Sequence, residues 1–156
     1  MKLISIFFIF ITTMFFNSNK LFSQSRIWLN PGIKLGYIFS ENGGFTYGFE
    51  VSLTGEGSKS ALYGIVLDIN YWNGRKKIHL GAQGSSTSTS VGLSVGPTWI
   101  LENGETDIGL SVTPFIGFYL FPYYEYTSRK EKSSIKEIGL YLKYPLQING
   151  KPWEIR

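Results

Sequence analysis

Residues 45–54, FTYGFEVSLT, decide the fold class of this chain. Every second residue is large and apolar, the period of two that marks a β-strand with one apolar face: Phe45, Tyr47, Phe49, Val51 and Leu53. The residues between them are mostly small, such as Gly48 and Ser52, where a soluble strand normally shows long polar side chains. Small residues suit the crowded inside of a narrow barrel, and the apolar face would then meet lipid. The stretch therefore predicts a strand of a membrane-spanning β-barrel.

The same alternation recurs at 32–39, 61–72, 91–101 and 135–144, and it continues after two Asn-Gly dipeptides. Asn73-Gly74 and Asn103-Gly104 are strong signals for two-residue hairpin turns. A turn of fixed length also fixes the pairing of its strands. The expected opposite pairs are Ile69 with Ile78, Leu67 with Leu80, Asp68 with His79, Asn70 with Lys77, Trp99 with Ile108 and Val95 with Val112.

The first hairpin is less sharply defined. The sequence Asn42, Gly43, Gly44 suggests a three-residue loop, which would place Phe39 opposite Tyr47 and Leu35 opposite Val51. Seven strands are clear in total. An eighth could come from residues 26–30, from residues 115–126, where Pro122 could hide a corner, or from the tail beyond Pro145. We therefore predict an all-β fold, a closed antiparallel up-and-down transmembrane β-barrel of seven to eight strands.

The N-terminus has the pattern of a secretory signal peptide over residues 1–23, which leaves residues 24–156 as the barrel domain. Lys2 precedes an apolar run at 3–16, too short for a transmembrane helix, and Ser23 is a small residue suited to cleavage. The chain contains no cysteine, which excludes disulfides and thiolate chemistry. Its net charge of +4 falls to +2 without Lys2 and Lys20, too weak a bias for a nucleic-acid partner.

Charged residues on the second face of the strands would lie inside the barrel. They combine three acids with three lysines and one histidine, a nearly neutral set suited to a buried polar network in the lumen. The set is Lys34, Glu50, Asp68, Lys77, His79, Glu137 and Lys143.

With these features the chain resembles the small outer-membrane β-barrel proteins of Gram-negative bacteria, which have about eight strands. Glu137, Gly139, Leu142 and Tyr144 match the family's assembly signal in the last strand, although residues 145–156 continue beyond it. Aromatic residues near strand ends match the family's interfacial girdles: Tyr63, Tyr71, Trp72, Trp99, Tyr123 and Tyr124. The resemblance implies a place in the outer membrane, with membrane lipid and the outer-membrane insertion machinery as partners. We also expect a monomer.

Candidate sites in the sequence are few. His79 with Asp68 could form a catalytic pair with Ser94 or Ser111, but no nucleophile motif surrounds these serines, so a structural hydrogen-bonded pair is favoured. We therefore expect no enzyme activity, no cofactor and no metal site. The basic clusters at 75–77 and 129–132 could meet lipopolysaccharide phosphates, although such runs more often form solvated loops.

Two function classes remain open at this stage. The first is an outer-membrane barrel with a filled polar lumen and a structural, adhesive or narrow-pore role. The alternative is a soluble secreted barrel of the lipocalin class, in which the apolar face would turn inward to bind an apolar ligand.

Overall fold

The computed structural model describes residues 26–40, 42–57, 61–86, 91–117, 119–130 and 132–149. The signal peptide predicted at residues 1–23 lies outside these ranges. All regular secondary structure within them is β-strand. No helix in these ranges is long and apolar enough to cross a membrane.

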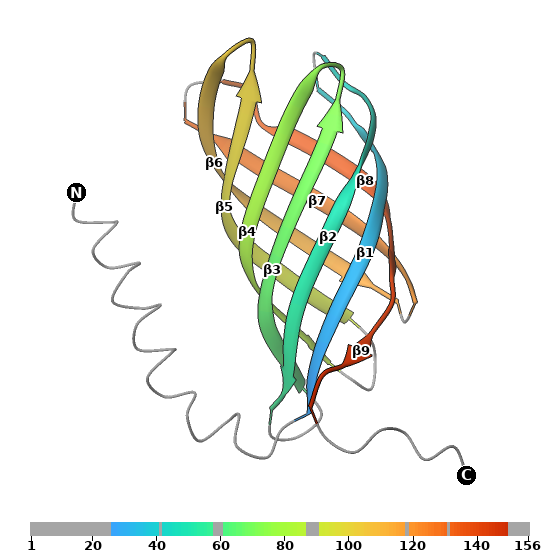
Figure 1. Cartoon of the computed structure of the whole chain (residues 1–156). Coiled ribbons are helices and arrows are strands. Elements are labelled where there is room, and N and C mark those ends of the chain that lie inside the picture. The colour runs from blue at the N-terminus through green and yellow to red at the C-terminus, as the bar shows by residue number, and fades with distance from the viewer. Residues whose placement is uncertain are drawn as a thin grey trace, which may run out of the picture.

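The strands form one closed antiparallel barrel (Figure 1). Each strand pairs with the next along the chain, and β1 pairs with both β2 and β8, which closes the sheet on itself. The predicted fold class is confirmed, with eight barrel strands. Their bounds are β1 Ile27–Ile38, β2 Gly44–Glu56, β3 Ala61–Trp72, β4 Arg75–Ser86, β5 Val91–Glu102, β6 Glu105–Ile116, β7 Leu120–Arg129 and β8 Ile135–Lys143.

A short ninth strand, β9 (Leu146–Gln147), extends the barrel wall. It pairs with Trp28 and Leu29 of β1 in the same register that β8 uses further along β1. Pro145 lies between the two segments and has no backbone N–H to donate to the ladder. β9 is therefore the continuation of β8 past a proline, and the tail after Tyr144 lies along β1 at least as far as Gln147.

Both Asn-Gly turns have the predicted geometry. Asn73 and Asn103 adopt positive φ values of 43° and 52°, as the first residue of this two-residue turn requires. The pairing that follows is the predicted one, with Ile69 opposite Ile78 and Trp99 opposite Ile108. The two turns and the β1–β2 and β7–β8 connections all lie at one end of the barrel (Figure 1). We call this end the hairpin end.

The predicted register of the first hairpin is wrong. Leu35 lies opposite Tyr47, and Tyr37 lies opposite Phe45, so the connection is longer than three residues. The error preserves which side chains face outward, because the strands are displaced by an even number of residues. Apolar residues meet apolar residues in both registers, and the hydrophobic pattern alone cannot separate them.

The eighth strand comes from residues 120–129, within the segment that showed no clear turn. The corner lies between the end of β6 at Ile116 and the start of β7 at Leu120 rather than at a proline. Gly117 has a φ of +144°, and a Cβ there would lie 2.0 Å from the Leu120 carbonyl oxygen. Glycine is therefore required at this corner, while Pro114 and Pro122 lie within β6 and β7.

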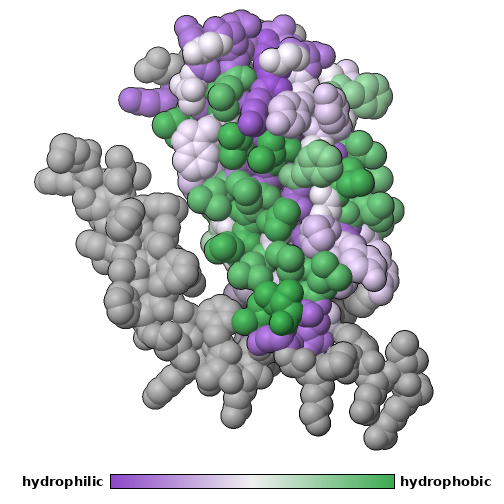
Figure 2. All heavy atoms as spheres, viewed as in Figure 1, coloured by the Kyte–Doolittle hydropathy of each residue, from purple (hydrophilic) through white to green (hydrophobic). Residues whose placement is uncertain are grey.

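The barrel has an apolar outside and a polar inside. Large apolar side chains are exposed around the wall, including Phe45 at 82% and Phe49 at 64%, whereas Lys34 and Glu137 are fully buried. Figure 2 shows the hydrophobic surface over the middle of the wall, with hydrophilic residues gathered at the hairpin end. This arrangement contradicts the lipocalin-like alternative, which requires the apolar face to turn inward.

The height of the wall also suits a bilayer. A strand of about 12 residues is about 40 Å long, and the tilt of about 40° usual in such barrels reduces its rise to about 30 Å. This is the thickness of the hydrocarbon core of a typical membrane.

Candidate functional site

The seven charged residues predicted for the lumen all lie inside the barrel, and none exposes more than 8% of its surface. The structure adds an eighth, Glu125 of β7, which is 1% exposed and lies at the centre of the group. We call these eight residues the lumen network. It contains four carboxylates, from Glu50, Asp68, Glu125 and Glu137, and three lysine ammonium groups.

The carboxylates form two like-charged pairs across neighbouring strands. Glu50 lies opposite Asp68 in the β2–β3 ladder, and Glu125 lies opposite Glu137 in the β7–β8 ladder. Like charges placed directly opposite one another repel, and inside a barrel little water is present to weaken the repulsion. Each pair therefore requires a cation close by.

Lysines supply these cations. Lys34 of β1 reaches both pairs, because its Nζ lies 2.6 Å from Asp68 Oδ2 and 2.8 Å from Glu125 Oε2. Lys77 of β4 crosses the lumen, where its Nζ lies 2.8 Å from Glu125 Oε1 and also donates to Glu137. Lys143 Nζ completes the set at 2.5 Å from Glu50 Oε1. The contacts join strands on opposite sides of the barrel.

His79 does not bind Asp68, although the two residues are opposite each other in the β3–β4 ladder as predicted. Its Nδ1 lies 3.0 Å from Thr98 Oγ1, and its Nε2 lies 3.1 Å from Ser94 Oγ. The expected His79–Asp68 hydrogen bond does not form: both ring nitrogens of His79 contact hydroxyl groups, and Asp68 Oδ2 binds Lys34 at 2.6 Å. The histidine therefore belongs to a set of hydroxyl groups and is not a base oriented by a carboxylate.

Within the lumen network, a chain of hydroxyl groups connects His79 to Glu125. Thr98 Oγ1 lies 2.6 Å from Ser111 Oγ, which in turn donates to Glu125 Oε1 at 3.2 Å. Thr127 closes the set, with its Oγ1 2.7 Å from Ser111 Oγ. No group of three His, Cys, Asp or Glu within the described ranges could hold a metal ion.

Two of the predicted interfacial aromatic residues point into the lumen, so their side chains do not lie at the lipid interface. Trp72 and Tyr123 are each only 3% exposed and point into the barrel, because they alternate with outward residues. Tyr123 donates its hydroxyl hydrogen to Glu137 and lies over Gly36 and Gly139, where added Cβ atoms would each lie 2.6 Å from its oxygen. These two glycines make room for the tyrosine ring, and Tyr123 is part of the lumen filling.

The other predicted aromatic residues point outward. Tyr63, Tyr71 and Tyr124 are exposed, and Trp99 is partly exposed on the outer side of β5. In the proposed assembly signal, Glu137 faces inward and Gly139 lies against Tyr123, whereas Leu142 and Tyr144 are exposed. The structure thus places the polar and apolar halves of this signal on opposite faces of the wall.

An apolar layer closes the lumen towards the hairpin end. It is formed by Ile38, Trp72, Ile100 and Ile135, all at most 3% exposed, and we call it the apolar plug. On the hairpin-end side of this plug lies a pocket of about 370 Å³, lined by Trp72, Ile135, Arg75, Glu102, Arg129 and Lys132 among others. The aromatic residues Phe115, Phe121, Tyr123 and Tyr141 pack together inside the barrel further from this end.

In the basic runs at 75–77 and 129–132, Arg75, Arg129 and Lys132 form ion pairs at the hairpin end. Arg75 Nη2 lies 2.6 Å from Glu102 Oε1, and Arg129 Nε lies 2.5 Å from Asp107 Oδ2. Lys132 Nζ lies 3.5 Å from Glu105 Oε2. Arg129 is also the last residue of β7 and not part of a loop, in contrast to the prediction.

Comparison with protein families and with curated protein sequences found no match. Comparison with solved structures did find similar folds. The crystal structure of Neisserial surface protein A (NspA) matches with a TM-score of 0.55 and 12% identity, covering 78% of this chain and 97% of that protein.

Two designed proteins also match, at lower scores. A de novo designed protein, TMB2.3, has a TM-score of 0.46 and 11% identity over 82% of this chain and 99% of its own. A protein from the de novo design of transmembrane β-barrels has a TM-score of 0.44 and 13% identity over 75% of this chain and 95% of its own. Together with the closed sheet and the apolar wall, the match to the Neisserial protein identifies the fold as that of an eight-stranded membrane β-barrel.

Proposed function

We propose that this chain is an outer-membrane β-barrel protein with a filled polar lumen and a structural, non-conducting role. The observation that carries the proposal is the inverted distribution of polarity. An apolar wall around buried lysines and carboxylates is favourable in lipid and unfavourable in water. The signal peptide predicted at residues 1–23 supports export from the cytoplasm.

The contents of the lumen favour a structural role over a narrow pore. Lys34 and Lys77 are held by carboxylates from several strands, so an ion passing through would have to break these contacts. The apolar plug adds a layer with little affinity for ions or water. The two-residue turns at the hairpin end also leave little chain for an adhesive surface.

We further propose that the chain is not an enzyme. Ser94 and His79 are within hydrogen-bonding distance, but the other ring nitrogen of His79 meets a hydroxyl group where a catalytic triad has a carboxylate. Both residues are at least 95% buried, which leaves no approach for a substrate. Labelling with a fluorophosphonate that reacts with activated serines tests this, and covalent attachment at Ser94 would contradict the proposal.

The proposed partners follow from the location. Membrane lipid covers the wall, and the insertion machinery recognises Glu137, Gly139, Leu142 and Tyr144. The barrel acts as a monomer because its eight barrel strands leave no open edge. Substitution of both Leu142 and Tyr144 by serine is expected to reduce assembly in cells while leaving the inward residues unchanged.

The main test combines fractionation with electrophoresis and conductance. The mature chain is expected in the outer-membrane fraction, to require detergent for extraction, and to migrate differently before and after heating. Reconstituted in a planar bilayer, it should show no steady conductance. A chain that remains soluble without detergent would overturn the membrane assignment, whereas stable single-channel currents would overturn only the non-conducting role.

A further inference from the structure

The outer wall carries very few charges. At the outward positions of the described barrel strands, set by their alternation, the charged residues are Lys76 of β4 and Lys136 of β8. The acidic residues of these strands lie at inward positions or at the rims, so no carboxylate accompanies either lysine on the wall. The ion pairs formed between described residues include neither one.

Each of the two lysines lies opposite a tyrosine on the neighbouring strand. Lys76 lies opposite Tyr71 in the β3–β4 ladder, and Lys136 lies opposite Tyr126 in the β7–β8 ladder. The Nζ atom of Lys76 lies 5.7 Å from the centroid of the Tyr71 ring. The same pair of residue types therefore occurs twice, on strands that are half a turn apart in an eight-stranded barrel.

The two pairs also lie at the same height. Lys77 and Glu137, the next residues in sequence, form an ion pair across the lumen, so positions 76 and 136 are level to within the reach of these side chains. Both positions are near the hairpin end, since Lys76 is the second residue of β4 and Lys136 is the second residue of β8. Figure 2 shows hydrophilic residues gathered at this end of the apolar wall. In a membrane this is the depth of the lipid headgroups.

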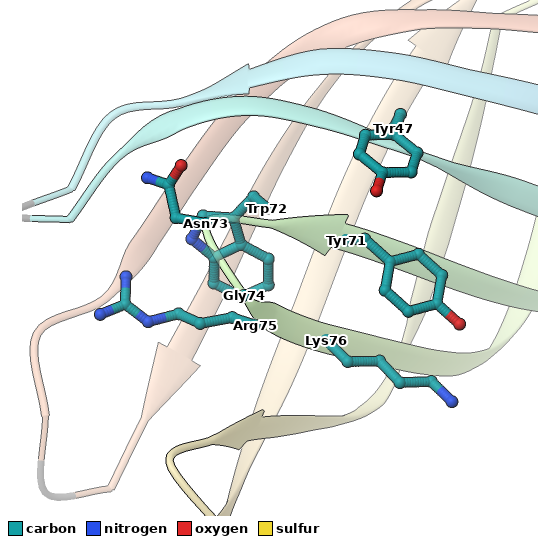
Figure 3. A pocket seen from close by; sticks show the side chains of 7 residues that line it. All are labelled: Tyr47, Tyr71, Trp72, Asn73, Gly74, Arg75 and Lys76. Carbon is teal, nitrogen blue, oxygen red and sulfur yellow. The ribbon is translucent and has the colours of Figure 1, made fainter.

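A pocket lies beside the first pair. It has a volume of about 240 Å³ and is lined by Tyr47, Tyr71, Trp72, Lys76 and the turn residues 73–75. Figure 3 shows the Tyr47 and Tyr71 rings on neighbouring strands, with the Lys76 side chain extending beyond Tyr71. The two rings stack with their centroids 6.0 Å apart. Arg75 is held by Glu102 and by the Asn42 carbonyl oxygen, which leaves Lys76 as the uncompensated cation.

We propose that the Tyr71–Lys76 and Tyr126–Lys136 pairs bind phosphate groups of anionic lipid headgroups in the leaflet around the hairpin end. The charge is complementary, the aromatic rings provide an interfacial surface, and Lys76 can extend its apolar stem along the wall while its ammonium group reaches the phosphate. Two such contacts on opposite sides would hold the barrel axis upright. This inference rests on the proposed membrane location.

The test uses the full mature chain, folded in micelles of a neutral detergent, and measures bound lipid by native mass spectrometry. The probes are lipid A with two phosphate groups and the same lipid with its phosphates removed. The variants are Lys76→Gln, Lys136→Gln and the double substitution. Arg26→Gln, which removes an exposed cation at the opposite end of the barrel, is the control.

Each single substitution is expected to weaken lipid A binding about fivefold at its own site and to leave the other site unchanged, because one lysine near an anionic surface contributes about 1 kcal/mol. The double substitution should weaken both sites about fivefold. Lys76→Arg should restore binding, and Arg26→Gln should leave it unchanged. Equal binding of lipid A by the wild type and the double variant would overturn the proposal, as would equal binding of the dephosphorylated lipid. Displacement of lipid A by millimolar inorganic phosphate would indicate a free-phosphate site and also overturn it.

Heat-dependent migration of each variant on gels separates this result from the proposed function. Folded variants with unchanged lipid binding would contradict only the headgroup sites. A wild-type chain that fails to enter vesicles would contradict the membrane location and the headgroup sites together.

Discussion

Lys34 and Glu125 meet inside the barrel from strands that share no backbone hydrogen bond. Nζ of Lys34 on β1 lies 2.8 Å from Oε2 of Glu125 on β7, and β8 lies between the two strands in the sheet. A contact of this kind forms only when β8 has paired with both of its neighbours. The Lys34–Glu125 ion pair therefore stabilises the closed barrel specifically and does not stabilise an open sheet.

Removal of the Lys34 side chain should destabilise the folded barrel. We expect Lys34→Met to lower the free energy of unfolding by about 3–5 kcal/mol, since Asp68 and Glu125 would lose their shared cation in a buried site. Urea titration in micelles, followed by the heat-dependent gel shift, measures the change. Lys130→Met in the exposed connection is the control, with an expected change below about 0.5 kcal/mol. A similar small loss for Lys34→Met would show that the buried ion pairs contribute little.

The space beneath Tyr123 should not tolerate a methyl group. A Cβ at Gly36 would lie 2.6 Å from Tyr123 Oη and 2.8 Å from the Ile138 carbonyl oxygen, so Gly36→Ala should destabilise the barrel by about 1–3 kcal/mol. Gly84→Ala is the matched control, because its Cβ would meet the Tyr63 ring at an ordinary 3.4 Å. Thermal unfolding in micelles compares the two. Equal stability of both variants would contradict the tight fit of Tyr123.

The register of the first hairpin can be tested by disulfide formation, because the chain has no cysteine of its own. Leu35 and Tyr47 are opposite each other, with a Cα separation that a disulfide can bridge. We expect Leu35→Cys with Tyr47→Cys to crosslink on mild oxidation. Leu35→Cys with Val51→Cys should not, because Val51 is four residues or about 13 Å further along β2. Crosslinking of the 35/51 cysteine pair but not of the 35/47 pair would instead support the three-residue loop.

Trp72 and Trp99 should differ in their contact with lipid. Trp72 is 3% exposed inside the barrel, whereas Trp99 lies on the outer side of β5. In variants that retain a single tryptophan, brominated lipid is expected to quench Trp99 strongly and Trp72 weakly. Phenylalanine replaces the other tryptophans. Strong quenching of Trp72 would return it to the interfacial group.

The parts of the fold that sequence predicts well are those fixed by local geometry. The Asn73-Gly74 and Asn103-Gly104 turns allow one loop length, so every pair in their hairpins follows. The β1–β2 connection lacks this constraint, and two registers that differ by an even number of residues satisfy the same hydrophobic pattern. The corner between β6 and β7 was missed because its only local signal is the single glycine at 117.

The prediction of the lumen residues from sequence had a similar limit. Seven of its charged residues follow from alternation, but Glu125 was missed because it lies in the aromatic stretch FPYYEY, which was interpreted as a girdle. Neighbouring residues of a strand face opposite sides, so Tyr123 and Tyr124 cannot both meet lipid. Applying that rule to β7 would have placed Tyr123 and Glu125 inside. The contacts between lysines and carboxylates depend on barrel closure and could not be read from the sequence.

The burial of Glu137 limits the stage of assembly at which the proposed signal is accessible. In the closed barrel this side chain is 0% exposed and is held by Lys77 and Tyr123, while Leu142 and Tyr144 remain exposed. A receptor that reads all four residues of the signal can therefore do so only before β8 pairs with β1. Closure hides the polar half of the signal, so on the proposed assembly route the finished barrel would lose affinity for the insertion machinery.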